Sequence, residues 1–254
     1  MSADWKTVGA PAALHDVRAV VFDMDGLLLN TESLANAALH LAAESLGLDM
    51  PQSFCFQLIG VPADGCRRLL FERFGPDAPA DRFFALAGEH LMAQIDRGLL
   101  GLRPGAAALL AHLDACGVPR AVATSSARHK TEHHLRAAGI IDRFDAIVTR
   151  DDVMRGKPHP DLFLRAAEVL GVPPASCLAL EDSHNGVRAA HAAGMPVIMV
   201  PDLLPATDEM RTACHAVLDS LAEVIGLLRC APTAGAKVAQ AFPIVQPDTD
   251  KETR

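Results

Sequence analysis

Short runs of hydrophobic residues alternate with longer segments of helical periodicity between residues 19 and 200. The short runs are too brief for helices and predict buried strands at 19–22, 120–123, 146–148, 177–180 and 197–200. The longer segments predict helices at 106–115, 127–138, 161–170 and 186–193. Strands that alternate with helices in this way are typical of a parallel sheet with crossover helices. We therefore expect an α/β fold built on a doubly wound, Rossmann-like parallel sheet.

Residues 32–101 break this rhythm, because they contain no convincing buried strand. Their periodicity predicts helices at 33–46, 63–73 and 81–97, with glycines and prolines between them. A helical cap inserted after the first strand is the simplest account, and the loop 58–61 is expected to reach the substrate. We predict a catalytic core of residues 17–31 and 102–230, a cap of 32–101, and a disordered tail of 231–254, where the chain turns polar.

Composition narrows the class of protein. Half of the 254 residues are hydrophobic and the mean hydropathy is +0.19, so the chain can bury a large core. The net charge of −8 argues against a nucleic-acid-binding surface, which concentrates Lys and Arg. No apolar run approaches the roughly 18 residues of a membrane span. The six cysteines are scattered without a C-x-x-C pair, and a chain of this length needs no disulfides for stability, so we expect a reducing cytoplasm. Composition leaves the oligomeric state open, with a monomer favoured.

The predicted strands end in polar residues, starting with Asp23-Met24-Asp25-Gly26. In an extended chain Asp23 and Asp25 point to the same side, and Gly26 allows the turn that follows. Two close carboxylates repel each other unless a positive charge lies beside them, and Mg²⁺ prefers carboxylate oxygens. The alternative is a pair of helix-capping aspartates in a loop. This segment alone therefore leaves both a metal site and a capping role open.

Three other segments strengthen the first interpretation. Glu181 and Asp182 form a second acidic pair at a strand end, and Thr124-Ser125 offers hydroxyl and backbone donors to a phosphate at a third. Lys157 lies between Gly156 and Pro158. A lysine in a rigid loop is suited to place one positive charge among these carboxylates.

Four ordered motifs resemble those of the haloacid dehalogenase superfamily of hydrolases, over about residues 19–202. They are the segment 21–32, Thr124, Lys157 and the segment 181–186. The position of the helical insert resembles the subgroup that includes β-phosphoglucomutase, sugar-phosphate phosphatases and pseudouridine-5'-phosphatase. One departure is Asn30, where this family often has aspartate. We do not expect it to abolish the chemistry.

The resemblance implies a magnesium-dependent phosphatase that acts on a small phosphorylated metabolite. Asp23 would attack phosphorus and become an aspartyl phosphate, while Asp25 would protonate the leaving alkoxide and later activate water. Thr124 and Lys157 would complete the catalytic group. The residues implied in substrate or phosphate binding are Met24, Gly26, Thr124, Ser125 and Lys157. The residues implied in holding Mg²⁺ are Asp23, Asp25 through its backbone carbonyl, Glu181 and Asp182.

Three alternatives were weighed. A dehalogenase is disfavoured because Asp25 supplies a proton that a departing halide does not need. The sugar-phosphate mutases carry a cap histidine and arginine at the positions of Ala35 and Ala63, although Arg67 or Arg68 could replace that arginine. A non-catalytic binding protein of the same fold could dispense with the catalytic aspartates, which are present here.

The predicted helix 127–138 carries a cluster of histidines. His129 and His133 have the spacing of a helical metal pair, and His134 follows them. The surrounding helix is polar and offers no third ligand nearby, so the sequence favours a solvated helix face.

Overall fold

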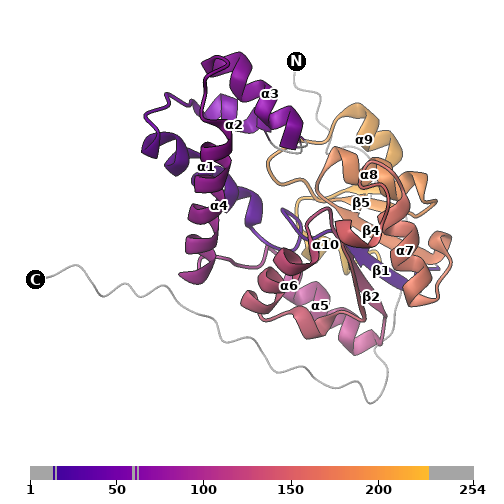
Figure 1. Ribbon diagram of the computed structural model, residues 1–254. Helices are drawn as coiled ribbons and strands as arrows, with labels where there is room; N and C mark the ends of the chain where they lie inside the picture. Colours follow the sequence, from indigo (N-terminus) through magenta and orange to yellow (C-terminus); the bar gives the residue numbers. More distant parts are fainter. Residues whose placement is uncertain (1–13, 15, 59–60, 62, 229–254) are drawn as a thin grey trace, which may run out of the picture.

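The computed structural model describes residues 14, 16–58, 61 and 63–228. The predicted tail 231–254 and Ile59 and Gly60 of the predicted cap loop lie outside the described residues. Within them a six-stranded parallel sheet has the order β3-β2-β1-β4-β5-β6 (Figure 1). The strands are β1 (Ala19–Phe22), β2 (Arg120–Ala123), β3 (Ala146–Val148), β4 (Cys177–Glu181), β5 (Val197–Met199) and β6 (Ala216–Val217). The predicted doubly wound parallel sheet is confirmed. The pattern missed only β6, which is two residues long.

Helices cover both faces of the sheet, so its strands are buried on both sides. Along β1, Val20 and Phe22 belong to one hydrophobic cluster, whereas Ala19 and Val21 belong to another. The first cluster includes residues of α5 (Ala106–Cys116), α6 (Arg128–Ala137) and α10 (Leu221–Val224). The second includes residues of α7 (Asp161–Leu170), α8 (His184–Ala192) and α9 (Asp208–Ala213). Short 3-10 turns span Ile141–Arg143, Arg150–Asp152 and Pro174–Ser176. This two-sided burial explains why the strands read as continuous hydrophobic runs.

Four helices lie apart from the sheet (Figure 1): α1 (Thr31–Ser45), α2 (Gln52–Leu58), α3 (Ala63–Phe74) and α4 (Ala80–Asp96). They share a hydrophobic cluster of their own, and α1 packs along α4. Leu34 of α1 and Leu91 of α4 instead join the cluster of the core. The sequence predicted three of the helices and missed α2. The assignment of 32–101 as a cap and of 17–31 with 102–230 as a core stays a prediction.

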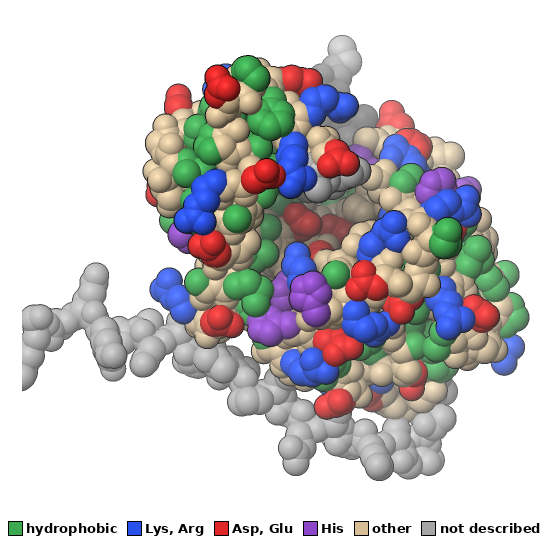
Figure 2. Space-filling view, in the orientation of Figure 1, with side chains coloured by type: hydrophobic (Ala, Val, Ile, Leu, Met, Phe, Trp, Pro, Cys, Tyr) green, Lys and Arg blue, Asp and Glu red, His purple; other side chains and the backbone are tan. Residues whose placement is uncertain are grey.

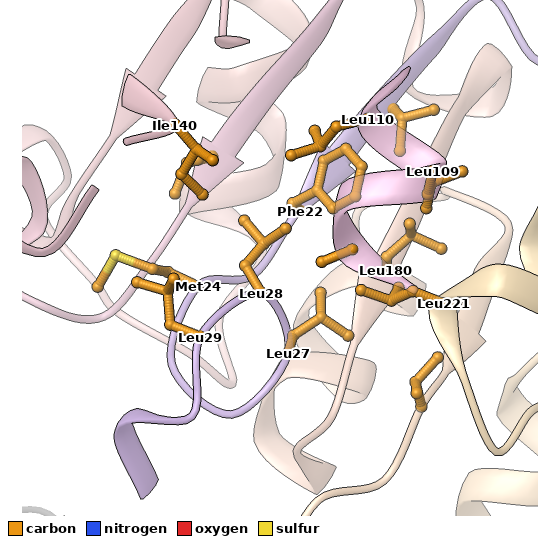
Figure 3. Packing of buried hydrophobic residues seen from close by; sticks show 14 of the residues in the cluster. Phe22, Met24, Leu27, Leu28, Leu29, Leu109, Leu110, Ile140, Leu180 and Leu221 are labelled. Atoms are coloured by element: carbon orange, nitrogen blue, oxygen red, sulfur yellow. The ribbon is translucent and has the colours of Figure 1, made fainter. Parts of the chain in front are cut away.

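Two chain segments connect these helices to the sheet, and hydrogen bonds join them. The side chain of Asn30 accepts from Gly101 N at 2.8 Å and donates to Leu99 O at 3.3 Å. Beside it, Leu29 and Leu102 form an antiparallel bridge. Leu29, with Leu27, Leu28 and Phe22, belongs to the buried apolar group in Figure 3. The connection is therefore anchored in the core at its sheet end.

Candidate active site

The predicted site residues meet at the carboxyl ends of three neighbouring strands. Asp23 follows β1, Thr124 follows β2, and Glu181 ends β4 with Asp182 next in the chain. The strand order reverses between β1 and β4, and doubly wound sheets bind ligands at such a switch point. Figure 2 shows a hollow between the four helices and the sheet, with acidic side chains inside it. The order of the strands in the sheet therefore brings residues up to 159 positions apart in the sequence into one site.

Lys157 is the positive centre of this site. Its ammonium contacts the carboxylate of Asp23 and donates to Glu181 Oε1 at 2.6 Å. The lysine side chain is only 6 % exposed. Burial alone would lower the pKa of Lys157, but the carboxylates of Asp23 and Glu181 outweigh it and raise that pKa above its ordinary value. Lys157 is therefore charged throughout the range in which proteins are stable.

One ammonium does not balance the acidic groups around it. Burial raises the pKa of Asp23 well above its ordinary value, and the neighbouring carboxylates of Glu181 and Asp25 add to the rise. Burial likewise raises the pKa of Asp182, with Asp23 and Glu181 as the next causes. Ligand oxygens of Asp23, Glu181 and Asp182 all lie within 4.8 Å of one another. Buried carboxylates this close have the chemistry of a divalent cation site, so the residues present fit a metal ion.

Glu181 also has a supporting role. Its Oε1 accepts from Lys157, while its Oε2 accepts from the backbone N–H groups of Asp182 and Ser183, each at 3.1 Å, and from the Ser183 hydroxyl at 3.0 Å. Gly186 leaves room for this carboxylate, because a Cβ there would overlap it. Glu181 thus fixes both Lys157 and the turn that carries Asp182.

Asp25 lies beside the cluster with a different set of partners. Its Oδ2 accepts from the hydroxyl of Ser126 at 2.7 Å and from that of Thr124 at 3.4 Å. Its Oδ1 lies 4.0 Å from Nδ1 of His134. The carboxylate of Asp25 is not among the three that converge as possible metal ligands. Two hydroxyl groups therefore hold the carboxylate of Asp25 beside the acidic cluster.

The remaining predicted contacts lie in the same region but in different environments. Gly26 has φ +86°, and a Cβ there would overlap Oδ2 of Asp182, so only glycine fits. Its N–H donates to Leu29 O at 3.0 Å. The side chain of Met24 is fully buried in the core, which leaves only its backbone for a substrate. Ser125 is exposed. These placements leave the predicted phosphate contacts of Met24, Gly26 and Ser125 as predictions.

Three residues near the site differ from the prediction or were not predicted. The sequence favoured a solvated position for His134, but its side chain is 0 % exposed, and burial lowers its pKa to about 4. Glu32, in the first turn of α1, has its pKa raised to about 7, first by burial and then by Asp25 and Asp202. Ser126 was visible only as part of the hydroxyl run after β2. The hydrophobic pattern carried no signal that His134 is buried, because the sequence of α6 is largely polar.

The comparisons with known proteins agree with this geometry. Residues 17–194 match the model of the haloacid dehalogenase-like hydrolase family, and the chain belongs to that family. It is 38 % identical over 222 residues to a Drosophila melanogaster protein named "Probable pseudouridine-5'-phosphatase", covering 84 % of this chain and 94 % of that one. It is 36 % identical over 210 residues to a Bacillus subtilis protein named "Putative phosphatase YhcW", covering 82 % of this chain and 94 % of that one.

The chain is also similar to a solved structure. CbbY from Rhodobacter sphaeroides in complex with xylulose-1,5-bisphosphate has a TM-score of 0.69 and 32 % identity, covering 82 % of this chain and 96 % of that one. The expected membership of this hydrolase family is confirmed, as is the class of enzyme, a hydrolase of phosphoric monoesters. Among the described residues no helix is long and apolar enough to cross a membrane.

Proposed function

We propose that this protein is a magnesium-dependent phosphatase that hydrolyses small sugar or nucleoside phosphate monoesters through an aspartyl phosphate on Asp23. The observation that carries the proposal is the position of the Asp23 carboxylate, which contacts Lys157 and converges with the carboxylates of Glu181 and Asp182. Such an arrangement holds a nucleophile and neutralises the charge of a phosphoryl group at one point.

In the first step the Asp23 carboxylate attacks phosphorus. A bond forms between its oxygen and phosphorus, the bond to the ester oxygen breaks, and Asp25 gives its proton to the departing oxygen. Thr124 donates a hydrogen bond from its hydroxyl to the phosphoryl group, and Lys157 favours the ionised form of Asp23 against the effect of burial. Mg²⁺, when bound by Asp23, Asp182 and the backbone carbonyl of Asp25 with Glu181 in support, supplies further positive charge to the phosphoryl oxygens.

In the second step water attacks the phosphorus of the aspartyl phosphate. Asp25, now ionised, takes a proton from this water, the bond between Asp23 and phosphorus breaks, and inorganic phosphate leaves. The two steps together return Asp23 ionised and Asp25 protonated. Residues 32–101 act as a cap that excludes bulk water during the first step and selects the leaving group. The backbone of Met24, Gly26 and Ser125 completes the phosphate contacts.

The test is a panel of phosphate monoesters assayed for phosphate release with and without Mg²⁺. Asp23→Asn keeps the shape of the side chain but removes the attacking charge, so turnover should fall by about 10³-fold or more with the fold intact. The matched control is Asp77→Asn, an exposed residue between α3 and α4, which should keep wild-type turnover. Near-normal turnover of Asp23→Asn would sink the covalent mechanism.

A further inference from the structure

Two buried polar atoms face each other beside the proposed reaction centre. Nδ1 of His134 and Oδ1 of Asp25 are 4.0 Å apart, and neither has a hydrogen-bond partner among the described residues. Nε2 of His134 also has none there. The imidazole is 0 % exposed and belongs to α6, whose N-terminus follows the strand end that carries Thr124.

A histidine at this position is costly unless it has a task. Leaving a buried polar group without a partner costs about 1–3 kcal/mol, which an apolar side chain of similar size avoids. The inward face of α6 also carries Leu135, which is fully buried in the core cluster, so an apolar residue would suit the position. Packing alone therefore does not explain why a histidine occupies this buried position, whereas the proximity of its Nδ1 to Asp25 does.

The imidazole is a hydrogen-bond donor in this environment. An imidazole carries a proton on at least one ring nitrogen in either charge state, so Nδ1 can donate to an acceptor that lies beside it. The separation of 4.0 Å exceeds a hydrogen bond by about 1 Å. Contacts of catalytic groups are often this long in the absence of substrate and shorten when it binds.

We propose that His134 is a positioning residue for Asp25. The Nδ1–H of His134 donates to Oδ1 of Asp25 when a phosphate ester fills the site. This role rests on the function proposed above. Oδ1 is then held by the imidazole, and the transferable proton of Asp25 lies on Oδ2. That oxygen is the one beside the hydroxyls of Ser126 and Thr124, where the phosphoryl group is bound. The proton on Oδ2 passes to the departing oxygen, and His134 keeps its own proton throughout.

If His134 positions Asp25, the loss of rate on replacing His134 should depend on the leaving group of the ester. A poor leaving group needs the proton of Asp25, whereas a good one departs without it. A misplaced Asp25 therefore slows esters of weakly acidic alcohols more than esters of acidic phenols. Phenyl phosphate and 4-nitrophenyl phosphate have similar shapes and differ chiefly in this property. The quantity to compare is kcat/KM, which reports the steps up to departure of the leaving group.

The experiment measures kcat/KM for both esters in the full-length protein with Mg²⁺. His134→Leu removes the donor at similar volume and should lower kcat/KM for phenyl phosphate by about tenfold or more, and for 4-nitrophenyl phosphate by less than about threefold. His134→Asn carries a donor close to the position of Nδ1 and should recover most of the loss. His134→Gln carries its donor nearer the position of Nε2 and should behave like His134→Leu, and it replaces that variant should His134→Leu not fold.

The matched control is Thr131→Val, a buried polar residue on the same helix whose hydroxyl donates to Ala127 O at 3.0 Å. It should leave the ratio between the two esters unchanged. Asp25→Asn distinguishes the acid role of Asp25 from the positioning role of His134. Equal losses on both esters for Asp25→Asn would refute the acid role of Asp25 itself. A selective loss for Asp25→Asn together with equal losses for the His134 variants would overturn the positioning role alone.

Discussion

Lys157 donates to Glu181 Oε1 at 2.6 Å while it contacts Asp23, so one buried ammonium offsets two buried carboxylates. Glu181 is fully buried and Asp23 is 6 % exposed. In such a cluster the loss of the single cation leaves negative charges that water cannot reach. This relationship makes the stability of the protein and the state of its nucleophile depend on the same side chain.

Lys157→Met should therefore reduce the free energy of unfolding by about 3–5 kcal/mol when measured by urea denaturation in chelator. Turnover should also be lost, because the positive charge that favours the ionised form of Asp23 is removed. The control is Arg165→Met, which removes an exposed ion pair with Glu168 and should cost less than about 1 kcal/mol. Equal midpoints for Lys157→Met and the wild type would contradict the compensating role of Lys157.

The carboxylate of Asp182 should act in opposite directions on stability and on metal binding. In chelator, Asp182→Asn should melt at a higher temperature than the wild type, because it removes a buried charge whose pKa is raised by burial and by Asp23. Added Mg²⁺ should stabilise the wild type, by about 2.7 kcal/mol at one hundred times its Kd, and should not stabilise the variant.

Metal identity gives a second arm to this experiment. Calcium should bind but support far less turnover, because its longer and looser coordination spoils the alignment of the attacking and leaving oxygens. Wild-type melting temperatures that do not respond to Mg²⁺, or full activity in excess chelator, would show that these carboxylates serve another purpose.

The parts of the site that could be predicted from sequence are those fixed by strand ends. Asp23, Thr124 and Glu181 each follow or end a hydrophobic run, and parallel strands bring such ends to one edge. Lys157 lies in a loop, so no strand end indicates its position. It was assigned to the site because the carboxylates need a positive charge and because the sequence resembles the family motif. The burial of His134 could not be predicted, because α6 is largely polar and its local pattern does not show that this imidazole is 0 % exposed in the folded chain.

Glu32 should make the metal-free protein less stable as the pH rises. Its pKa is raised from 4.5 to about 7 in the folded state, so the folded protein holds a proton that the unfolded chain has released between these values. Stability therefore falls with increasing pH across this window and is unaffected by Glu32 below it. Glu32→Gln should remove this slope and stabilise the protein at pH 8 by up to about 3 kcal/mol.

The measurement is urea denaturation in chelator at pH 4.5 and pH 8 for both proteins. The exposed Glu44→Gln, on the same helix, provides the control and should leave the pH dependence of the wild type unchanged. Parallel pH profiles for Glu32→Gln and the wild type would show that Glu32 does not hold its proton in the folded state.

The last prediction separates a phosphatase from a phosphomutase. A mutase must keep water from the aspartyl phosphate and hold a second phosphate in the cap, where the sequence offers Ala35 and Ala63 at the positions of the mutase histidine and arginine. Arg67, the possible replacement, lies 3.0 Å from Asp81 and 3.8 Å from Asp64. Arg68 lies 3.7 Å from Glu72. Both guanidinium groups are thus paired with carboxylates of the cap.

Water should therefore be the normal acceptor, and the phosphorylated enzyme should be short-lived. We expect a hexose 1-phosphate to release stoichiometric inorganic phosphate without a bisphosphate activator, measured as phosphate release alongside analysis of the sugar products. Arg67→Met and Arg68→Met should leave this stoichiometry unchanged, since neither arginine is needed when water is the acceptor. Conversion to the 6-phosphate with little free phosphate, lost in either variant, would show that the arginine leaves its carboxylate partners to hold a second phosphate and that the enzyme is a mutase.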